Sequence, residues 1–208
     1  MRLQKGKVLH YRLGIILIPN NKHLSGLREL EFMNIIEFDS YLLINKLPNK
    51  PVSKIELPNY FKSISEDLDR IKKDIAKFSP IIEDQVIYLD GAIRIKFNNQ
   101  ILIDFDYWDD ITTLWHFYLN VLADCLTTGE GECYFPNQSI TIKMINLQND
   151  ISFQVGEITK VINKKVFVQQ LLSGAQKYYN FTKTLLGTDV ELELYNRILQ
   201  IEKITICF

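Results

Sequence analysis

Glycine, proline and cysteine are all sparse in this chain, with nine, six and three of them in 208 residues. No internal repeat or low-complexity tract interrupts the sequence. The cysteines, Cys125, Cys133 and Cys207, form no C-x-x-C pair, and no histidine stands at a zinc-like spacing from two of them. An odd, sparse set of this kind also argues against a secreted fold held together by disulfides.

An excess of charge of one sign is also lacking, because 24 lysines and arginines nearly balance 25 acidic residues for a net charge of −1. Without a basic excess to attract phosphates, general nucleic-acid binding is disfavoured. No apolar run approaches the roughly 18 residues that cross a bilayer, and the run at 13–18 is too short for a signal-peptide core. We therefore expect a cytoplasmic protein that has no membrane span.

The composition is that of a globular chain, with 47 % hydrophobic and 24 % charged residues. A chain of this length suits a single domain. The stretch 47–58, which contains Pro48, Pro51 and Pro58, is the best candidate for a boundary. An N-terminal, strand-rich lobe at 1–50 is therefore possible.

Apolar residues recur at spacings of three and four in several segments, which predicts amphipathic helices. The segments 64–78, 109–126 and 164–186 show this pattern, and Gly187 is suited to end the third. Capping boxes are predicted at Ser63 with Glu66 and at Thr188 with Glu191, so a fourth helix is expected after Thr188. The alternation at 190–194 would fit a strand as well.

Alternating or β-branched residues between these helices predict strands in antiparallel pairs. The dipeptides Asp90-Gly91 and Asn98-Asn99 are expected to form hairpin turns, whereas Asp39-Ser40 separates two strands. Strands without a regular βαβ rhythm indicate an α+β fold, with an antiparallel sheet of meander hairpins packed by three to four helices. The predicted strands are 7–18, 32–38, 41–47, 85–89, 92–97, 100–105, 139–146, 151–155 and 204–208.

A search for catalytic motifs finds no nucleophile elbow, Walker loop, dinucleotide fingerprint or H-E-x-x-H helix. We therefore predict no catalytic residue, no cofactor and no metal ligand. His116 is the one histidine with polar neighbours, since Asp109 lies seven residues earlier on the same helix face and Asn120 lies four residues later. This pair could act as a general base or as half of a metal site, or it could be an exposed polar helix flank.

The most distinctive stretch is 104–110, in which Asp104, Asp106, Asp109 and Asp110 alternate with aromatic residues. Glu130 and Glu132 could join these acids if the fold returns the loop after the helix. Such a cluster fits a divalent-cation site, a carboxylate pair for hydrolysis, an acidic docking surface, or a solvated strand end and helix start. Phe117, on the polar side of its helix, is either covered by another element or a contact residue.

The same region carries a resemblance to a known class of protein. Its residues are Leu114-Trp115 and Leu119-Asn120, then TGEGE at 128–132 and YFPNQ at 134–138, followed by a strand. This pattern resembles small bacterial proteins, some of which are thought to act as immunity proteins encoded beside polymorphic toxins. The resemblance runs from Asp104 to Ile145 and extends to the helix expected at 164–186, about 60 residues in all, and implies a protein that folds alone and inhibits a toxin by protein–protein contact.

On this interpretation the partner is a protein, and many toxin domains are basic nucleases that an acidic patch would attract. The residues expected to contact it are Asp104, Asp106, Asp109, Asp110, His116, Phe117, Glu130 and Glu132. Two other classes remain open, namely a structural or assembly subunit and a carboxylate-based, metal-dependent enzyme.

Overall fold

Two antiparallel sheets and four α-helices make up the α+β fold seen in a computed structural model, which describes residues 35–49, 51–66, 68–75, 81–83, 86–186 and 191–205. The strand expected at 7–18 and the start of the one at 32–38 lie outside these residues. The first sheet has the order β2-β1-β5-β6, and β7 pairs with β5. Its strands are β1 (Ile36–Leu43), β2 (Phe61–Ser63), β5 (Asp90–Phe97), β6 (Gln100–Ile103) and β7 (Asp109–Asp110).

The second sheet is a four-stranded meander with the order β11-β10-β9-β8. One face of β9 and β10 is buried at alternate positions, as expected for a sheet with one covered and one open face. A separate hairpin joins two short strands, β3 and β4. The strands are β8 (Glu130–Tyr134), β9 (Thr141–Leu147), β10 (Asp150–Val155), β11 (Ile158–Asn163), β3 (Ile81–Glu83) and β4 (Val86–Tyr88).

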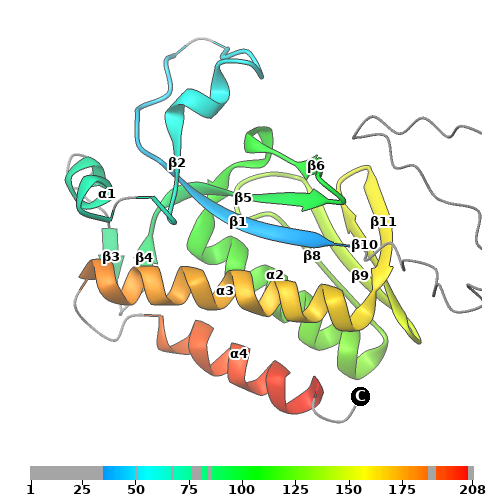
Figure 1. The fold of residues 1–208 in the computed structure, drawn as a ribbon. Coiled ribbons are helices and arrows are strands. Elements are labelled where there is room, and N and C mark those ends of the chain that lie inside the picture. The colour runs from blue at the N-terminus through cyan, green and yellow to red at the C-terminus, as the bar shows by residue number, and fades with distance from the viewer. Residues whose placement is uncertain are drawn as a thin grey trace, which may run out of the picture. The chain divides into compact units, whose positions relative to one another are not determined.

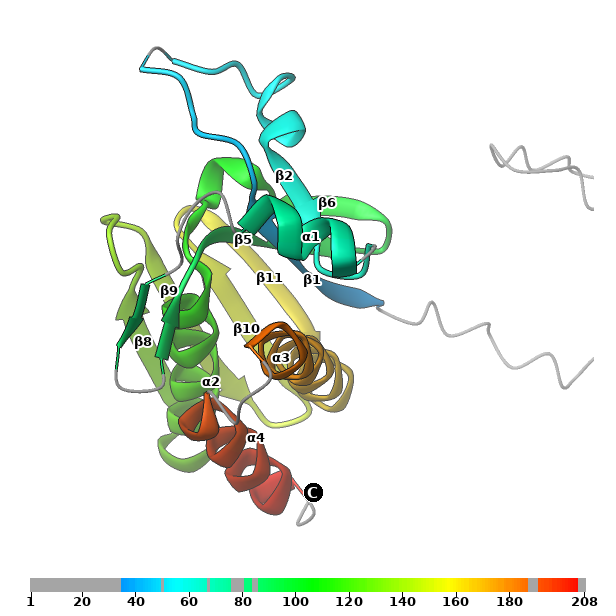
Figure 2. The ribbon, with the colours of Figure 1, turned by 90° about the vertical axis from the view of Figure 1, so that its left-hand side faces the viewer.

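Two long helices cover the meander, with α2 on β8 and β9 and α3 on β10 and β11 (Figure 2). On its other side α3 lies along β1, and α4 packs on the outside of α2 and α3 (Figure 1). The helices are α1 (Leu68–Ile75), α2 (Ile111–Thr128), α3 (Lys164–Leu186) and α4 (Leu192–Thr205), and two short 3-10 helices are η1 (Leu57–Tyr60) and η2 (Phe105–Tyr107).

The centre of the core is a group of aromatic rings contributed by both sheets and both long helices. Phe38 of β1 contacts Trp115 of α2, Phe153 of β10 and Phe167 of α3, with ring centroids 5.7–6.5 Å apart. The Trp115 indole N–H donates to the hydroxyl of Ser40 at 3.0 Å, so the one polar atom of that ring is satisfied inside the core. Both sheets and both long helices therefore pack against the same cluster of rings.

Several local predictions are wrong, each for a tertiary reason. Asp39-Ser40 does not split two strands, because both residues lie inside the continuous strand β1. Asp90-Gly91 is not a hairpin turn, because these residues pair with β7 while β4 pairs with β3. A side chain at position 91 would lie 2.4 Å from the Tyr41 carbonyl oxygen, so the glycine permits close approach of two backbones.

One turn prediction is confirmed, and two further local predictions are wrong. Asn98 and Asn99 form the β5–β6 turn, with φ values of 50° and 63° that suit a two-residue hairpin. The capping box at Ser63 does not form, because Ser63 ends β2 and α1 begins at Leu68. The strand expected at 204–208 is also wrong for its first two residues, because α4 continues through Thr205, and 206–208 lie outside the described residues.

Gly174 tests the close packing between α3 and the core. An added Cβ at this position would lie 2.7 Å from Cη2 of Trp115 and 2.9 Å from Cβ of Phe38. Gly174→Ala should therefore lower the free energy of unfolding by about 2 kcal/mol in urea titration, although alanine is the better helix former. Ser173→Ala, on the exposed face of the same helix, is the matched control and should leave stability unchanged or slightly raised. A stabilised Gly174→Ala variant would contradict this packing.

Candidate functional site

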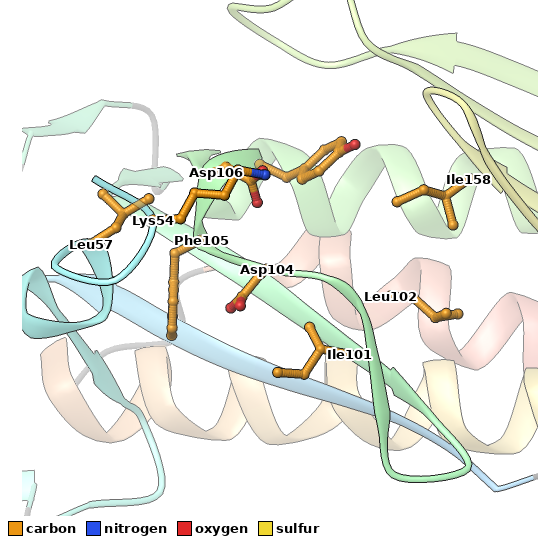
Figure 3. A pocket seen from close by; sticks show the side chains of 9 residues that line it. Lys54, Leu57, Ile101, Leu102, Asp104, Phe105, Asp106 and Ile158 are labelled. Carbon is orange, nitrogen blue, oxygen red and sulfur yellow. The ribbon is translucent and has the colours of Figure 1, made fainter. Parts of the chain in front are cut away.

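A hollow of about 310 Å³ lies beside η2, where two of the predicted acidic residues are found (Figure 3). It is formed by the loop before η1, by β6 and η2, and by the first residue of β11. Its walls combine aliphatic side chains with two carboxylates and one ammonium group. The lining residues are Lys54, Leu57, Ile101, Leu102, Asp104, Phe105, Asp106, Tyr107 and Ile158.

Phe105 fixes the position of the two carboxylates on either side of it. Its ring is buried in a small cluster on the outer face of the first sheet, stacked on Phe61 at 4.7 Å and edge-on to Tyr41 at 5.0 Å. Strand β6 ends before Asp104, and η2 begins at Phe105, so the expected strand through 105 is too long. The conclusion that Asp104 and Asp106 share a strand face therefore does not hold, although both still line the hollow.

Each carboxylate of the hollow is paired with a cation. Asp104 Oδ1 lies 3.1 Å from Nε of Arg94, and the Arg94 guanidinium lies 5.2 Å from the centre of the Phe105 ring. Asp106 accepts a short hydrogen bond from the Lys54 ammonium, and this bond raises the pKa of Lys54. Because the Lys54 side chain is 84 % exposed, a competing cation can reach its carboxylate partner.

The same sheet face continues this charge pattern. Lys96 of β5 lies 3.7 Å from Glu37 and 3.6 Å from Asp39, both on β1. Together with the pairs of the hollow, this face holds four carboxylates (Glu37, Asp39, Asp104, Asp106) and three cations (Lys54, Arg94, Lys96), a balance of 3 − 4 = −1. The face is therefore weakly acidic, with its charges held in defined positions.

Exposed aliphatic side chains lie among these charges. Ile55 follows Lys54 in the loop that forms one wall, and it is 89 % exposed. Ile101 of β6 lines the hollow and is 46 % exposed. An isoleucine that leaves nearly its whole side chain in water, beside a partly apolar hollow, is a feature of contact surfaces.

Asp109 and Asp110 have structural roles instead. Asp109 is 3 % exposed and accepts three hydrogen bonds, from the Asp110 N–H at 2.8 Å and from the backbone N–H and amide of Asn137 at 2.9 and 2.6 Å. Asp110 is the N-cap of α2, accepting from the Thr113 N–H at 2.6 Å, and it also accepts from the Leu89 N–H at 3.1 Å. These contacts hold the start of α2 to β4, β5 and the loop after β8.

Glu130 and Glu132 lie on a different part of the molecule. Both pair with Lys143 on the neighbouring strand β9, and Glu132 lies 3.0 Å from its ammonium. These two acids raise the pKa of Lys143. Their strand, β8, and the strand β11 that contributes Ile158 to the hollow are opposite edges of one sheet. Three strand spacings, roughly 14 Å, separate these edges, so the six acids do not form one patch.

His116 has a carboxylate partner, but a different one from the predicted Asp109. Its Nε2 lies 3.1 Å from Oε2 of Glu191, a residue 75 positions later whose side chain is fully buried. The other oxygen of Glu191 accepts from the Ile87 N–H at 2.8 Å. Glu191 also has a φ of 60°, in the left-handed region that few residues other than glycine adopt. The sequence marked Glu191 only as part of a capping box with Thr188, which lies outside the described residues, and could not reveal its partners Ile87 and His116 because they are distant in sequence.

Phe117 is half-buried and packs against the main hydrophobic core. Of the eight residues predicted for a contact surface, the structure thus brings Asp104 and Asp106 together at a hollow. It places Asp109 in the interior, uses Asp110 as a helix cap, and distributes His116, Phe117, Glu130 and Glu132 over other sites. Sequence reasoning missed Ile55 and Ile101, whose exposure depends on how the loop and the sheet edge are arranged.

Comparison with known proteins adds no assignment, because no protein-family model, curated protein or solved structure matches the chain. Among the side chains that the structure describes, no group of three or more histidine, cysteine, aspartate or glutamate residues could hold a metal ion. Within the same part of the chain, no helix combines the length and apolar content needed to cross a bilayer.

Substitution of Asp90 tests whether its charge repels Asp110 at the start of α2. It stands opposite Asp110 in the β5–β7 ladder, and partial burial together with the Asp110 charge raises its pKa. Because the pKa of Asp90 in the folded state is above the ordinary 3.8, ionisation of Asp90 lowers the free energy of unfolding as the pH rises past 3.8. Because Asp90 is exposed and solvent screens its charge, Asp90→Asn should stabilise the protein at pH 7 by at most about 0.5 kcal/mol, and the gain should vanish near pH 3. Thermal unfolding at both pH values measures this, with Glu157→Gln as an exposed control.

Substitution of Glu191 tests how much its buried hydrogen bonds, which join the segment before α4 to the rest of the fold, stabilise the protein. Glu191→Ala leaves the Ile87 N–H and His116 Nε2 without their partner, and should lower the free energy of unfolding by about 2 kcal/mol. Glu191→Gln keeps an oxygen acceptor for the Ile87 N–H and should lose about half as much. Equal losses in the two variants, measured by urea titration, would show that a side chain of the same shape with one oxygen acceptor is not enough and that the carboxylate itself is required.

Proposed function

We propose that this protein is a non-enzymatic binding protein that contacts a partner protein through the hollow beside η2. The observation that carries the proposal is the exposure of Ile55 and Ile101 next to a hollow walled by Asp104 and Asp106. Protein contact surfaces combine apolar side chains at their centre with polar and charged groups at their rim. Burial of both isoleucines by a partner would remove them from water and is worth roughly 1–2 kcal/mol each.

The charges around the hollow favour a basic partner. Among the described residues, Asp106 is paired with the exposed Lys54, so an incoming arginine or lysine can replace that ammonium without burying an unpaired carboxylate. The weakly acidic sheet face around it would also speed the approach of a basic protein.

The finer proposal is that the partner is a bacterial toxin and that the protein is its immunity-type inhibitor. It is supported by the resemblance of residues 104–145 to such proteins and by the suitability of an acidic, partly apolar face for covering a basic toxin domain. On this proposal inhibition is stoichiometric, since the protein blocks its partner by contact and consumes nothing.

Capture of the tagged chain from its native host, followed by reconstitution, tests the proposal. We expect one stoichiometric partner whose isolated activity is abolished by an equimolar amount of this protein. A partner that stays active in the reconstituted complex would contradict inhibition. Recovery of a defined homo-oligomer without any partner would instead favour the structural or assembly role.

A pair of double variants locates the surface. Asp104→Asn with Asp106→Asn should slow association with the reconstituted partner about tenfold at low salt and weaken its salt dependence. Glu130→Gln with Glu132→Gln, at the opposite edge of the second sheet, removes the same charge and should change neither. Stopped-flow association rates at two ionic strengths measure both. Equal effects of the two double variants would mean that net charge acts and that the hollow does not.

A further inference from the structure

The hollow beside η2 is amphipathic along its length (Figure 3). At one end lie the carboxylates of Asp104 and Asp106, close to the loop that carries Lys54. Leu102 and Ile158 lie at the other end, away from this loop. A long side chain with an aliphatic stem and a charged tip matches this division, because the stem can cover apolar surface while the tip meets the carboxylates.

The charged end already holds a cation that belongs to the protein itself. Asp106 accepts a hydrogen bond from the Lys54 ammonium, and no other described residue pairs with this carboxylate. The pKa of Lys54 is raised chiefly by that hydrogen bond and by the Asp106 charge, with a smaller contribution from Asp104. The ammonium therefore lies within the field of both carboxylates, at the position that the cation of a ligand would take.

Lys54 is an occupant that can be displaced easily. Its side chain is 84 % exposed, whereas that of Asp106 is 30 % exposed. An ion pair whose cation stands in water contributes little free energy, so the exchange of this ammonium for another cation has a small cost. Lys54 also directly precedes the exposed Ile55, so a partner that covers this isoleucine contacts the same short stretch of the loop.

The second carboxylate favours a cation that has several donors. Asp104 is 37 % exposed, and its Oδ1 lies 3.1 Å from Nε of Arg94. Within the described part of the chain, neither of these two atoms has a hydrogen-bond partner, so the Asp104 carboxylate can still accept from a ligand. A guanidinium can bond to two carboxylates and lie against an aromatic ring such as that of Tyr107, which lines the hollow, whereas an ammonium is a compact point charge.

We propose that the hollow is an arginine-binding site in which Lys54 occupies the guanidinium position until an arginine of the partner displaces it. The stem of this arginine lies against Leu102 and Ile158, and its guanidinium bonds to Asp106 and Asp104. The inference rests on the proposed function, because it names the side chain by which the partner enters the hollow. It also makes Lys54 a competitor of the partner, although Lys54 is part of the contact surface.

NMR titration of the full chain with Nα-acetyl-arginine amide tests the site without a partner protein. We expect saturable shifts of the backbone amides of β6 and η2, with a dissociation constant on the order of 1 mM, as suits a ligand of about 15 heavy atoms. Nα-acetyl-citrulline amide, the neutral isostere, should bind at least about tenfold more weakly. Nα-acetyl-lysine amide should bind about threefold more weakly, because it lacks the planar set of donors.

Truncation of Lys54 has an expected sign that an ordinary contact residue would not show. Lys54→Ala should strengthen binding of the arginine derivative about threefold, because the competing ammonium is removed. Lys46→Ala, at another exposed lysine of the same loop, makes the same change in net charge and should leave binding unchanged. Asp106→Asn should weaken binding about tenfold. Weaker binding by Lys54→Ala, equal binding of the citrulline derivative, or no saturable binding up to about 20 mM overturns the proposal.

Failure of this site and failure of the proposed function give different results. If a captured partner binds but the arginine derivative does not, the arginine site is overturned while the contact surface stands. If the arginine derivative binds as expected but no partner protein is recovered, the arginine site stands while the proposed function fails.

Discussion

Close contact between α3 and β1 at Gly174 allows the aromatic core of the domain to assemble. With no side chain at this position, the helix comes near enough for Phe38 and Trp115 to lie against its backbone. The rings of Phe38, Trp115, Phe153 and Phe167 then meet in one cluster. The first sheet, the second sheet and the two long helices share this cluster, and the separation of α3 from β1 follows from that approach. A small residue at one helix position thereby lets α3 pack closely on the aromatic rings.

The sequence predicted the elements whose signals are local and missed those that depend on distant partners. The bounds of α3 agree with the structure at both ends, because its apolar stripe is long and Gly187 follows it. The β5–β6 turn was also predictable, since two adjacent asparagines tolerate positive φ. In contrast, Asp39-Ser40 has turn chemistry yet lies in β1, where Ser40 is needed to accept from Trp115. The need for this acceptor comes from Trp115, which lies 75 positions later in the sequence, so no local pattern could reveal it.

The acidic stretch 104–110 shows how one sequence feature can serve several purposes. Burial of Phe105 divides it, leaving Asp104 and Asp106 at the hollow, while Asp109 and Asp110 become acceptors for backbone N–H groups. One alternative from the sequence, a strand end followed by a helix start, anticipated this division, but the sequence did not predict that Asp109 would be buried. The partner of His116 was equally hidden, because a buried carboxylate on the segment before α4 is recognised only once α4 is docked.

The order of elements along the chain has a consequence for how the domain assembles. Residues 111–186 form a continuous run of helix, four-stranded meander and helix, in which most contacts join neighbours in sequence. The contact between β1 and α3 instead spans more than a hundred residues, and closing such a loop has a larger entropic cost than closing a hairpin. We therefore expect the central run to form early in folding, and the addition of β1 across α3 to complete the aromatic cluster later.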